Sequence, residues 1–212
     1  MSSYKALAKI SMTLKDILWE AYAADDEIIN IIGNDKEQGI VFKNPTETAK
    51  KAANKLSVWL YQITENEYLK NQPMLRPPAQ AVTGVPERLQ FPPLALNLFY
   101  LITPFASQEG DDGRADHRLL AKTMEVLYDN AIVVVQDEVE DIAEELRIIL
   151  CRLSLEELTR IWEALREPYR LSICYQIRVT RIDSQRMPQM TRVIEQNSKY
   201  SDKPVSRQGN ER

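Results

Sequence analysis

Few side chains in this sequence could carry chemistry, and they stand far apart. His117 is the single histidine and lies between Asp116 and Arg118, at the predicted start of a helix. Histidine-based acid–base catalysis needs a second reactive group within hydrogen-bond reach, and a zinc site needs several Cys or His ligands. The sequence places neither close to His117. We therefore interpret His117 as a surface or interface residue and predict no metal site.

The thiols and paired carboxylates give no stronger signal. Cys151 and Cys174 fall inside predicted strands without motif spacing, which favours small buried thiols. A disulfide would be unusual in a cytosolic product. The pairs Asp25–Asp26 and Asp111–Asp112 could do general acid work, but adjacent acids in polar loops are usually solvated. The segment 110–113 also lacks the ordered oxygen ligands of a calcium loop.

The sequence motifs of common catalytic sites are missing as well. There is no phosphate-binding glycine loop, no dinucleotide-binding Gly-x-Gly-x-x-Gly, no Gly-x-Ser-x-Gly elbow and no His-Glu-x-x-His. We therefore predict a protein that is not an enzyme, with no catalytic residue and no cofactor.

Composition indicates one domain with an extension. The chain has 212 residues, and its 44% apolar content is enough for a sizeable core. No apolar run approaches the roughly 20 residues of a membrane-spanning helix, and the first residues lack a signal-peptide core. We expect synthesis and assembly in the cytoplasm, without direct insertion into a membrane.

Charge is unevenly distributed along the chain. The net charge is −4, but residues 185–212 hold six basic and three acidic side chains. An acidic body makes nucleic acid an unfavourable partner, because phosphate contacts need clustered Lys and Arg. We hypothesise that the basic extension lies against an acidic run of another subunit. The side chains assigned to this contact are Arg186, Arg192, Lys199 and Lys203 on the extension and Asp137, Glu138, Glu140 and Asp141 on the run.

Hydrophobic periodicity predicts helices and strands over residues 1–184, which we treat as one domain. Residues 185–212 lack a core-forming pattern and are predicted to be a flexible extension that becomes ordered on assembly. Helices are predicted at 4–24, at 114–129 and from Ser154, where Ser154 and Glu157 form a capping box. Strands are predicted at 39–43, 55–68, 91–105, 131–135, 144–153 and 169–183.

Three of these elements carry further predictions. The strand at 91–105 is apolar on both faces and should lie inside the sheet. The last helix should bury a stripe of Leu155, Leu158, Ile161, Trp162 and Leu165. The strand at 169–183 would span about 50 Å at about 3.3 Å per residue. That excess length would invite pairing with another chain.

Five segments together resemble a known family. They are residues 93–106, 116–120, 145–150, 153–158 followed by Trp162, and 168–172. They look like the N-terminal domain of the tail-terminator or cap protein of extracellular contractile injection systems, which are phage-tail-like particles. The likeness covers residues 4–184 and is closest after residue 90.

The resemblance implies a phage tail-terminator-like α+β fold, in which helices flank a mixed sheet, and a structural role. Family members form rings, expected here to hold six copies, that close the distal end of the inner tube and the sheath. The implied partners are other copies of the chain, the inner tube protein and the terminal sheath protein. The acidic run that the basic extension contacts would then belong to a neighbouring protomer or a sheath subunit. The family has no catalytic residues to transfer, and His117 would be an inter-subunit contact, with Arg118 beside it. The resemblance leaves open whether the particle is released or membrane-anchored.

Two other functions remain possible from the sequence. One is a baseplate or sheath-adaptor component of the same machine. The other is a cytosolic ligand-binding or enzymatic α/β domain that uses the Asp111–Asp112 loop, which would require a deep polar pocket.

Overall fold

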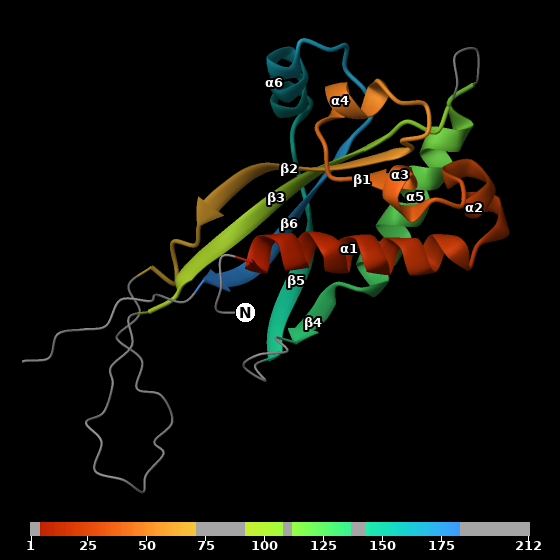
Figure 1. Ribbon diagram of the computed structural model, residues 1–212. Helices are drawn as coiled ribbons and strands as arrows, with labels where there is room; N and C mark the ends of the chain where they lie inside the picture. The colour runs from red at the N-terminus through yellow and green to blue at the C-terminus, as the bar shows by residue number, and fades with distance from the viewer. Residues whose placement is uncertain (1–4, 71–91, 108–111, 137–142, 183–212) are drawn as a thin grey trace, which may run out of the picture.

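Six strands and six helices make up the described part of the chain (Figure 1). The structure is a computed structural model and describes residues 5–70, 92–107, 112–136 and 143–182. The helices are α1 (Ala6–Ala23), α2 (Asp26–Ile32), α3 (Lys36–Gly39), α4 (Pro45–Ala49), α5 (Arg114–Asp129) and α6 (Leu155–Leu165). The strands are β1 (Ile40–Val41), β2 (Leu56–Glu65), β3 (Leu94–Pro104), β4 (Ile132–Gln136), β5 (Ala143–Cys151) and β6 (Ile173–Ile182).

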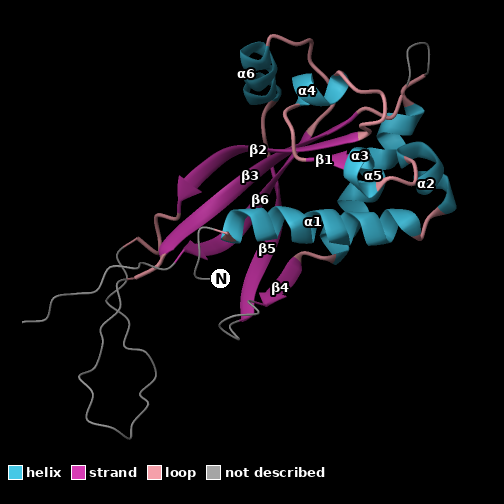
Figure 2. Cartoon of the chain, viewed as in Figure 1, coloured by secondary structure: helices cyan, strands magenta, loops and turns pink. Residues whose placement is uncertain are grey.

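The strands form one mixed sheet in the order β1-β2-β3-β6-β5-β4. β1 pairs with β2 in parallel, and every other neighbouring pair is antiparallel. The predicted α+β class is therefore confirmed (Figure 2). β3 lies inside the sheet between β2 and β6, as its apolar faces predict.

The core lies between α1, α5 and one face of the sheet. α1 places Ala6, Ile10, Leu14, Leu18 and Tyr22 four residues apart, and all five are buried. Side chains four apart share one face of a helix, so this spacing makes α1 amphipathic. They pack against alternate residues of the central strands, which are Leu98, Tyr100, Ile102, Tyr175 and Ile177.

Two buried tyrosines satisfy their hydroxyl groups inside this core. The Tyr22 hydroxyl lies 2.7 Å from Thr123 Oγ1 on α5, and the Tyr100 hydroxyl lies 3.0 Å from Ser11 Oγ on α1. Burial raises the pKa of both phenols. These hydrogen bonds fix α1 against both α5 and the sheet, because a buried hydroxyl without a partner is costly.

The last strand is shorter than predicted. β6 begins at Ile173, and Tyr169 and Leu171, predicted strand residues, are each 45% exposed. The ladder ends because Cys151, the last residue of β5, pairs with Cys174, so no residue of β5 lies opposite 169–172. Side chains make the next contact instead, with Thr103 Oγ1 2.9 Å from Ser172 Oγ. The expected 50 Å strand, and the pairing argument drawn from its length, are wrong.

Candidate interaction surface

Helix α6 has an apolar face that the rest of the described chain covers only in part. The predicted capping box is present: the Glu157 amide donates to Ser154 Oγ at 3.2 Å, and the Ser154 amide donates to Glu157 Oε2 at 2.8 Å. The predicted buried stripe is wrong, since only Trp162 is buried and Leu155 is 67% exposed. In Figure 1, α6 lies away from α1 and α5, the helices that cover the core face of the sheet.

Strand β4 forms one edge of the sheet. It pairs with β5, and no second strand borders it among the described residues. Val135 points into the core, whereas Ile132 and Val134 on the opposite face are each 59% exposed. A β-branched edge strand with free backbone groups is a template for pairing with another chain. This edge, with Ile132 and Val134, is called the β4 edge below.

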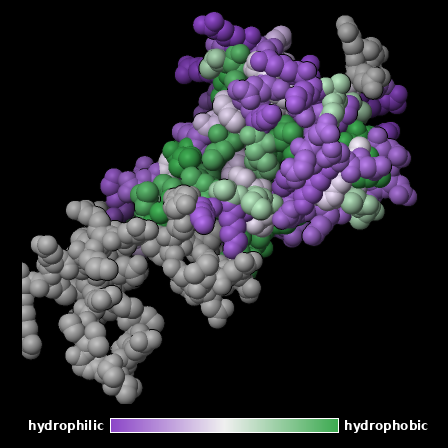
Figure 3. All heavy atoms as spheres, in the orientation of Figure 1, coloured by the Kyte–Doolittle hydropathy of each residue, from purple (hydrophilic) through white to green (hydrophobic). Residues whose placement is uncertain are grey.

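The strand ends far from β4 carry further exposed apolar side chains. Ile63 on β2 and Leu94 on β3 are each 45% exposed. In Figure 3 hydrophobic residues gather along β2 and β3, between the polar surfaces of α1 and α4. Apolar surface that borders a polar rim is typical of protein–protein contacts.

The motif at 116–118 divides into a structural residue and two surface residues. Asp116 Oδ1 accepts from the backbone N–H groups of Ala106 (2.6 Å) and Ser107 (2.9 Å), which fixes the loop after β3. His117 is exposed. Arg118, predicted to be an interface residue, forms an exposed ion pair with Glu27 of α2. Such a pair contributes only about 0–1 kcal/mol, so it leaves the Arg118 side chain accessible.

The remaining predicted interface residues lie outside the part that the structure describes. They are Asp137, Glu138, Glu140, Asp141, Arg186, Arg192, Lys199 and Lys203. Glu145, at the end of the acidic run, is described and lies 3.1 Å from Arg147 Nε within the same chain. The proposed contact between the extension and the acidic run therefore stays a prediction.

The motif can be tested one residue at a time. Asp116→Ala removes the acceptor of two backbone donors, and we expect it to lower stability by about 2 kcal/mol, or Tm by roughly 4–8 °C. His117→Ala should change stability by less than about 0.5 kcal/mol. Thermal unfolding of both variants checks this, with Asp116→Asn as the control that keeps an acceptor oxygen. Equal losses for Asp116→Ala and His117→Ala would contradict the assignment.

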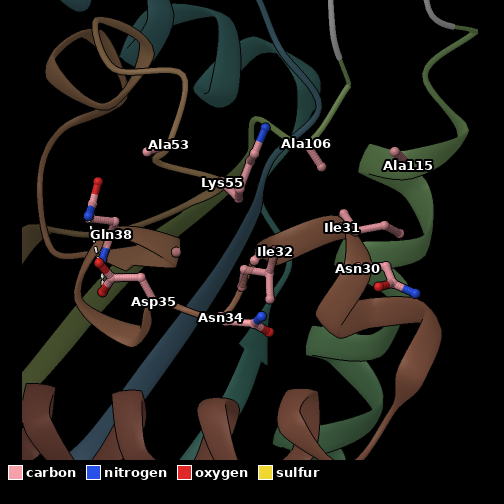
Figure 4. Close-up of a pocket in the computed structure, with 12 residues that line it drawn as sticks. Asn30, Ile31, Ile32, Asn34, Asp35, Gln38, Ala53, Lys55, Ala106 and Ala115 are labelled. Carbon is pink, nitrogen blue, oxygen red and sulfur yellow. Dashed lines mark hydrogen bonds between the residues drawn. The ribbon is translucent and has the colours of Figure 1, made fainter.

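One polar pocket lies between α2, α3 and the loop that follows β3 (Figure 4). It has a volume of about 410 Å³, and its polar lining includes Asn30, Asp35, Gln38 and Lys55. The Asp35 carboxylate accepts from Gln38 Nε2 at 2.5 Å and from the backbone amides of Glu37 and Gln38, which lowers its pKa. Asp35 therefore caps α3 as an ionised carboxylate.

Other reactive groups in the described segments are also dispersed. No cluster of three or more His, Cys, Asp or Glu in those segments could hold a metal ion. Asp112 binds Arg114 at the surface, and Asp111 lies outside the described residues. No helix in the same segments is long and apolar enough to cross a bilayer. Cys174 is buried as predicted, whereas Cys151 is half-buried, and both are free thiols.

Comparison with known families gives the decisive observation. The model of the Pvc16 N-terminal domain family matches residues 9–196, which is most of the chain. The chain belongs to the Pvc16 N-terminal domain family. The match extends past the predicted domain boundary at residue 184, so the family pattern includes the first part of the basic extension.

Two solved structures are similar to the chain. The chain is similar to the PVC sheath/tube terminator of an extracellular contractile injection system in its extended state, with a TM-score of 0.57 and 18% identity. That match covers 97% of this chain and 65% of the terminator, so the chain spans less than two thirds of its length. The anti-feeding prophage cap, a tube-terminating cap, is also similar, with a TM-score of 0.45 and 19% identity. That match covers 68% of this chain and 48% of the cap chain. No curated protein matches the chain.

The resemblance seen in the sequence and the terminator-like fold are thus confirmed. The predicted interface residues did not include the exposed apolar residues of β4 and α6. Their signal was present in the sequence, because β4 is a β-branched run and α6 carries an apolar stripe, but neither pattern says which chain covers it.

Proposed function

We propose that this protein is a structural tail terminator of an extracellular contractile injection system. Six copies form a ring that closes the distal end of the tube and the sheath, in contact with the inner tube protein and the terminal sheath protein. The observation that carries the proposal is the family match over residues 9–196 together with the fold likeness to a sheath/tube terminator over 97% of this chain. The chain has no catalytic role in this proposal.

The surface of the described chain supports assembly on physical grounds. A closed ring needs two different surfaces on each subunit, because each copy contacts its neighbours head to tail. The β4 edge and the apolar face of α6 are two such surfaces on separate elements. We assign the β4 edge to the contact between copies.

Native mass spectrometry and electron microscopy of the purified full chain test this function. We expect a six-copy species and ring-shaped particles. A protein that stays monomeric at about 50 μM, a concentration at which micromolar contacts form, and that is absent from isolated particles would contradict the proposal.

A baseplate or sheath-adaptor role in the same machine is the alternative that shares this fold. Labelling the protein in intact particles and locating the label by electron microscopy separates the two. A label at the baseplate end would favour the adaptor. The pocket near Asp35 does not favour an enzyme, since its one carboxylate caps a helix.

The basic extension gives a separate prediction. Deleting residues 185–212 should weaken ring formation at low salt and have a smaller effect at about 0.5 M salt, because salt screens exposed charges. Ring fractions measured by native mass spectrometry or sedimentation at both salt concentrations check this. A full-length chain with Arg186, Arg192, Lys199 and Lys203 changed to Gln should behave like the deletion. Unchanged ring formation in both variants would exclude a role for these charges.

A further inference from the structure

The two free thiols face each other across neighbouring strands. Cys151 of β5 pairs directly with Cys174 of β6 in the antiparallel ladder. Both side chains lie on the face of the sheet away from α1, since the flanking Ile173 and Tyr175 belong to the core. Opposed residues in such a ladder have Cα atoms roughly 4.5–5.5 Å apart. That separation lies within the range of about 4.4–6.8 Å found for disulfides.

The surroundings of the thiols slow their oxidation at neutral pH. Burial raises the pKa of Cys174 to about 12 and also raises the pKa of Cys151. The hydroxyl of Tyr61 on β2 lies 3.3 Å from Cys174 Sγ. Because the thiolate is the reactive form, both groups react slowly with oxidants inside a reducing cytosol. Cys151 is half-buried and Cys174 only 2% exposed, so an oxidant reaches Cys151 first.

We propose that Cys151 and Cys174 form an oxidation site that closes to a cross-strand disulfide when the protein meets a small-molecule disulfide such as oxidised glutathione. The Cys151 thiolate attacks one sulfur of that oxidant, which forms a mixed disulfide and releases one thiol. Cys174 then loses its proton, attacks the Cys151 sulfur and releases the second thiol. Two protein thiols are oxidised, and one external disulfide is reduced to two thiols.

The position of this bond gives it a structural consequence. Residues 152–172, which include α6, leave the sheet after Cys151, and the chain returns to it at Ile173, one residue before Cys174. A disulfide here closes that excursion at its base and restrains α6. Burial raises the pKa of the Tyr61 phenol, and the nearby thiols raise it further.

The biological occasion for oxidation depends on the proposed function, since an extracellular particle leaves the reducing cytosol. The site itself depends only on the register of β5 and β6. It is therefore tested on the isolated full-length chain, where its failure would leave the ring assay unaffected.

The experiment incubates the folded chain with oxidised glutathione at pH 8.5, alkylates it after unfolding, and measures its mass. We expect a monomer lighter by two hydrogen atoms, with neither thiol alkylated and with the Cys151 and Cys174 peptides linked until reduction. The Tm of the oxidised protein should rise by about 5–10 °C. A lasting glutathione adduct, a disulfide between two chains, or two alkylated thiols would overturn the proposal.

A matched control moves one thiol along the same face. The control is the double variant Cys174→Ser/Gln176→Cys, whose two thiols are at positions 151 and 176. These positions are diagonal neighbours, because Gln176 lies opposite Ile149 rather than Cys151. Diagonal neighbours are about 7–8 Å apart, too far for a disulfide without backbone movement. We expect no bridge in this variant. Equal closure in the control and the natural chain would show that register does not determine the reaction and would also overturn the proposal.

Discussion

Charging the β4 edge is expected to abolish ring formation while leaving the monomer folded. Val134→Lys places an ammonium group in the apolar surface that we assign to the contact between copies. Taking this ammonium group out of water in the contact should cost about 3 kcal/mol per contact, even with a carboxylate beside it, which weakens association about a hundredfold. Native mass spectrometry at a concentration where the natural chain forms rings should show only monomer.

The sheet register explains why the monomer should tolerate this change. Val134 lies directly opposite Glu145 on β5, and Ile132 lies opposite Arg147. The lysine of Val134→Lys therefore faces a carboxylate, and the glutamate of Ile132→Glu faces a guanidinium. Opposite charges in such cross-strand positions are favourable by roughly 0.2–1 kcal/mol. Both variants should unfold within a few degrees of the natural chain.

A control separates the position of the charge from its presence. Met12 on α1 is 65% exposed, close to the 59% of Val134, but α1 packs on the core face of the sheet, whereas Val134 points to the opposite face. Met12→Lys should leave the ring intact. Rings that survive Val134→Lys and Ile132→Glu would show that copies do not meet at the β4 edge. Loss of the ring in Met12→Lys as well would show that net charge, rather than this edge, governs assembly.

Long elements with a strong period were predictable from the sequence. The helix predicted at 4–24 is α1 (Ala6–Ala23), and the helix predicted at 114–129 is α5 with the same bounds. In both, apolar residues recur at helical spacing over several turns. Such a pattern has few alternatives, because another conformation would expose the whole apolar face to water. The capping box at Ser154 located the start of α6 for a similarly local reason.

The short helices were missed because periodicity needs more residues than they have. α2, α3 and α4 contain seven, four and five residues. Each begins after an Asx side chain that accepts from the first turn, namely Asp25, Asp35 and Asn44. Those caps, together with Pro45 at the first position of α4, were readable signals. An isolated helix of this length is unstable, so its formation depends on tertiary packing that the sequence does not display.

The interaction surface could be predicted only in part, for a different physical reason. An apolar stripe shows that a face is favourable to bury, but it does not identify the chain that covers it. The stripe of α6 was therefore assigned to the core, whereas most of it is partly or largely exposed. The facing thiols are a similar case, because opposition of Cys151 and Cys174 follows from the β5–β6 register, which no local pattern specifies.

Removing the anchor of α6 is expected to release this helix without unfolding the sheet. Trp162 is 2% exposed and is the one residue of α6 that is fully buried, with its ring 6.5 Å from that of Tyr169. Trp162→Ala should remove about 3–5 kcal/mol of packing. Because α6 packs apart from α1 and α5, this loss should appear as local opening. Hydrogen exchange should accelerate at least tenfold in α6 and change little in β3.

Leu155 on the same helix provides the matched control. It is 67% exposed, so Leu155→Ala should change the free energy of opening of α6, as measured by hydrogen exchange, by less than about 0.5 kcal/mol. If α6 also contributes to assembly, Leu155→Ala should weaken the ring while keeping the helix in place, and Trp162→Ala should affect both. Unchanged α6 protection in Trp162→Ala would mean that the half-buried Leu158, Ile161 and Leu165 hold the helix without the tryptophan. The apolar face of α6 would then be committed to its own chain and not open to a partner.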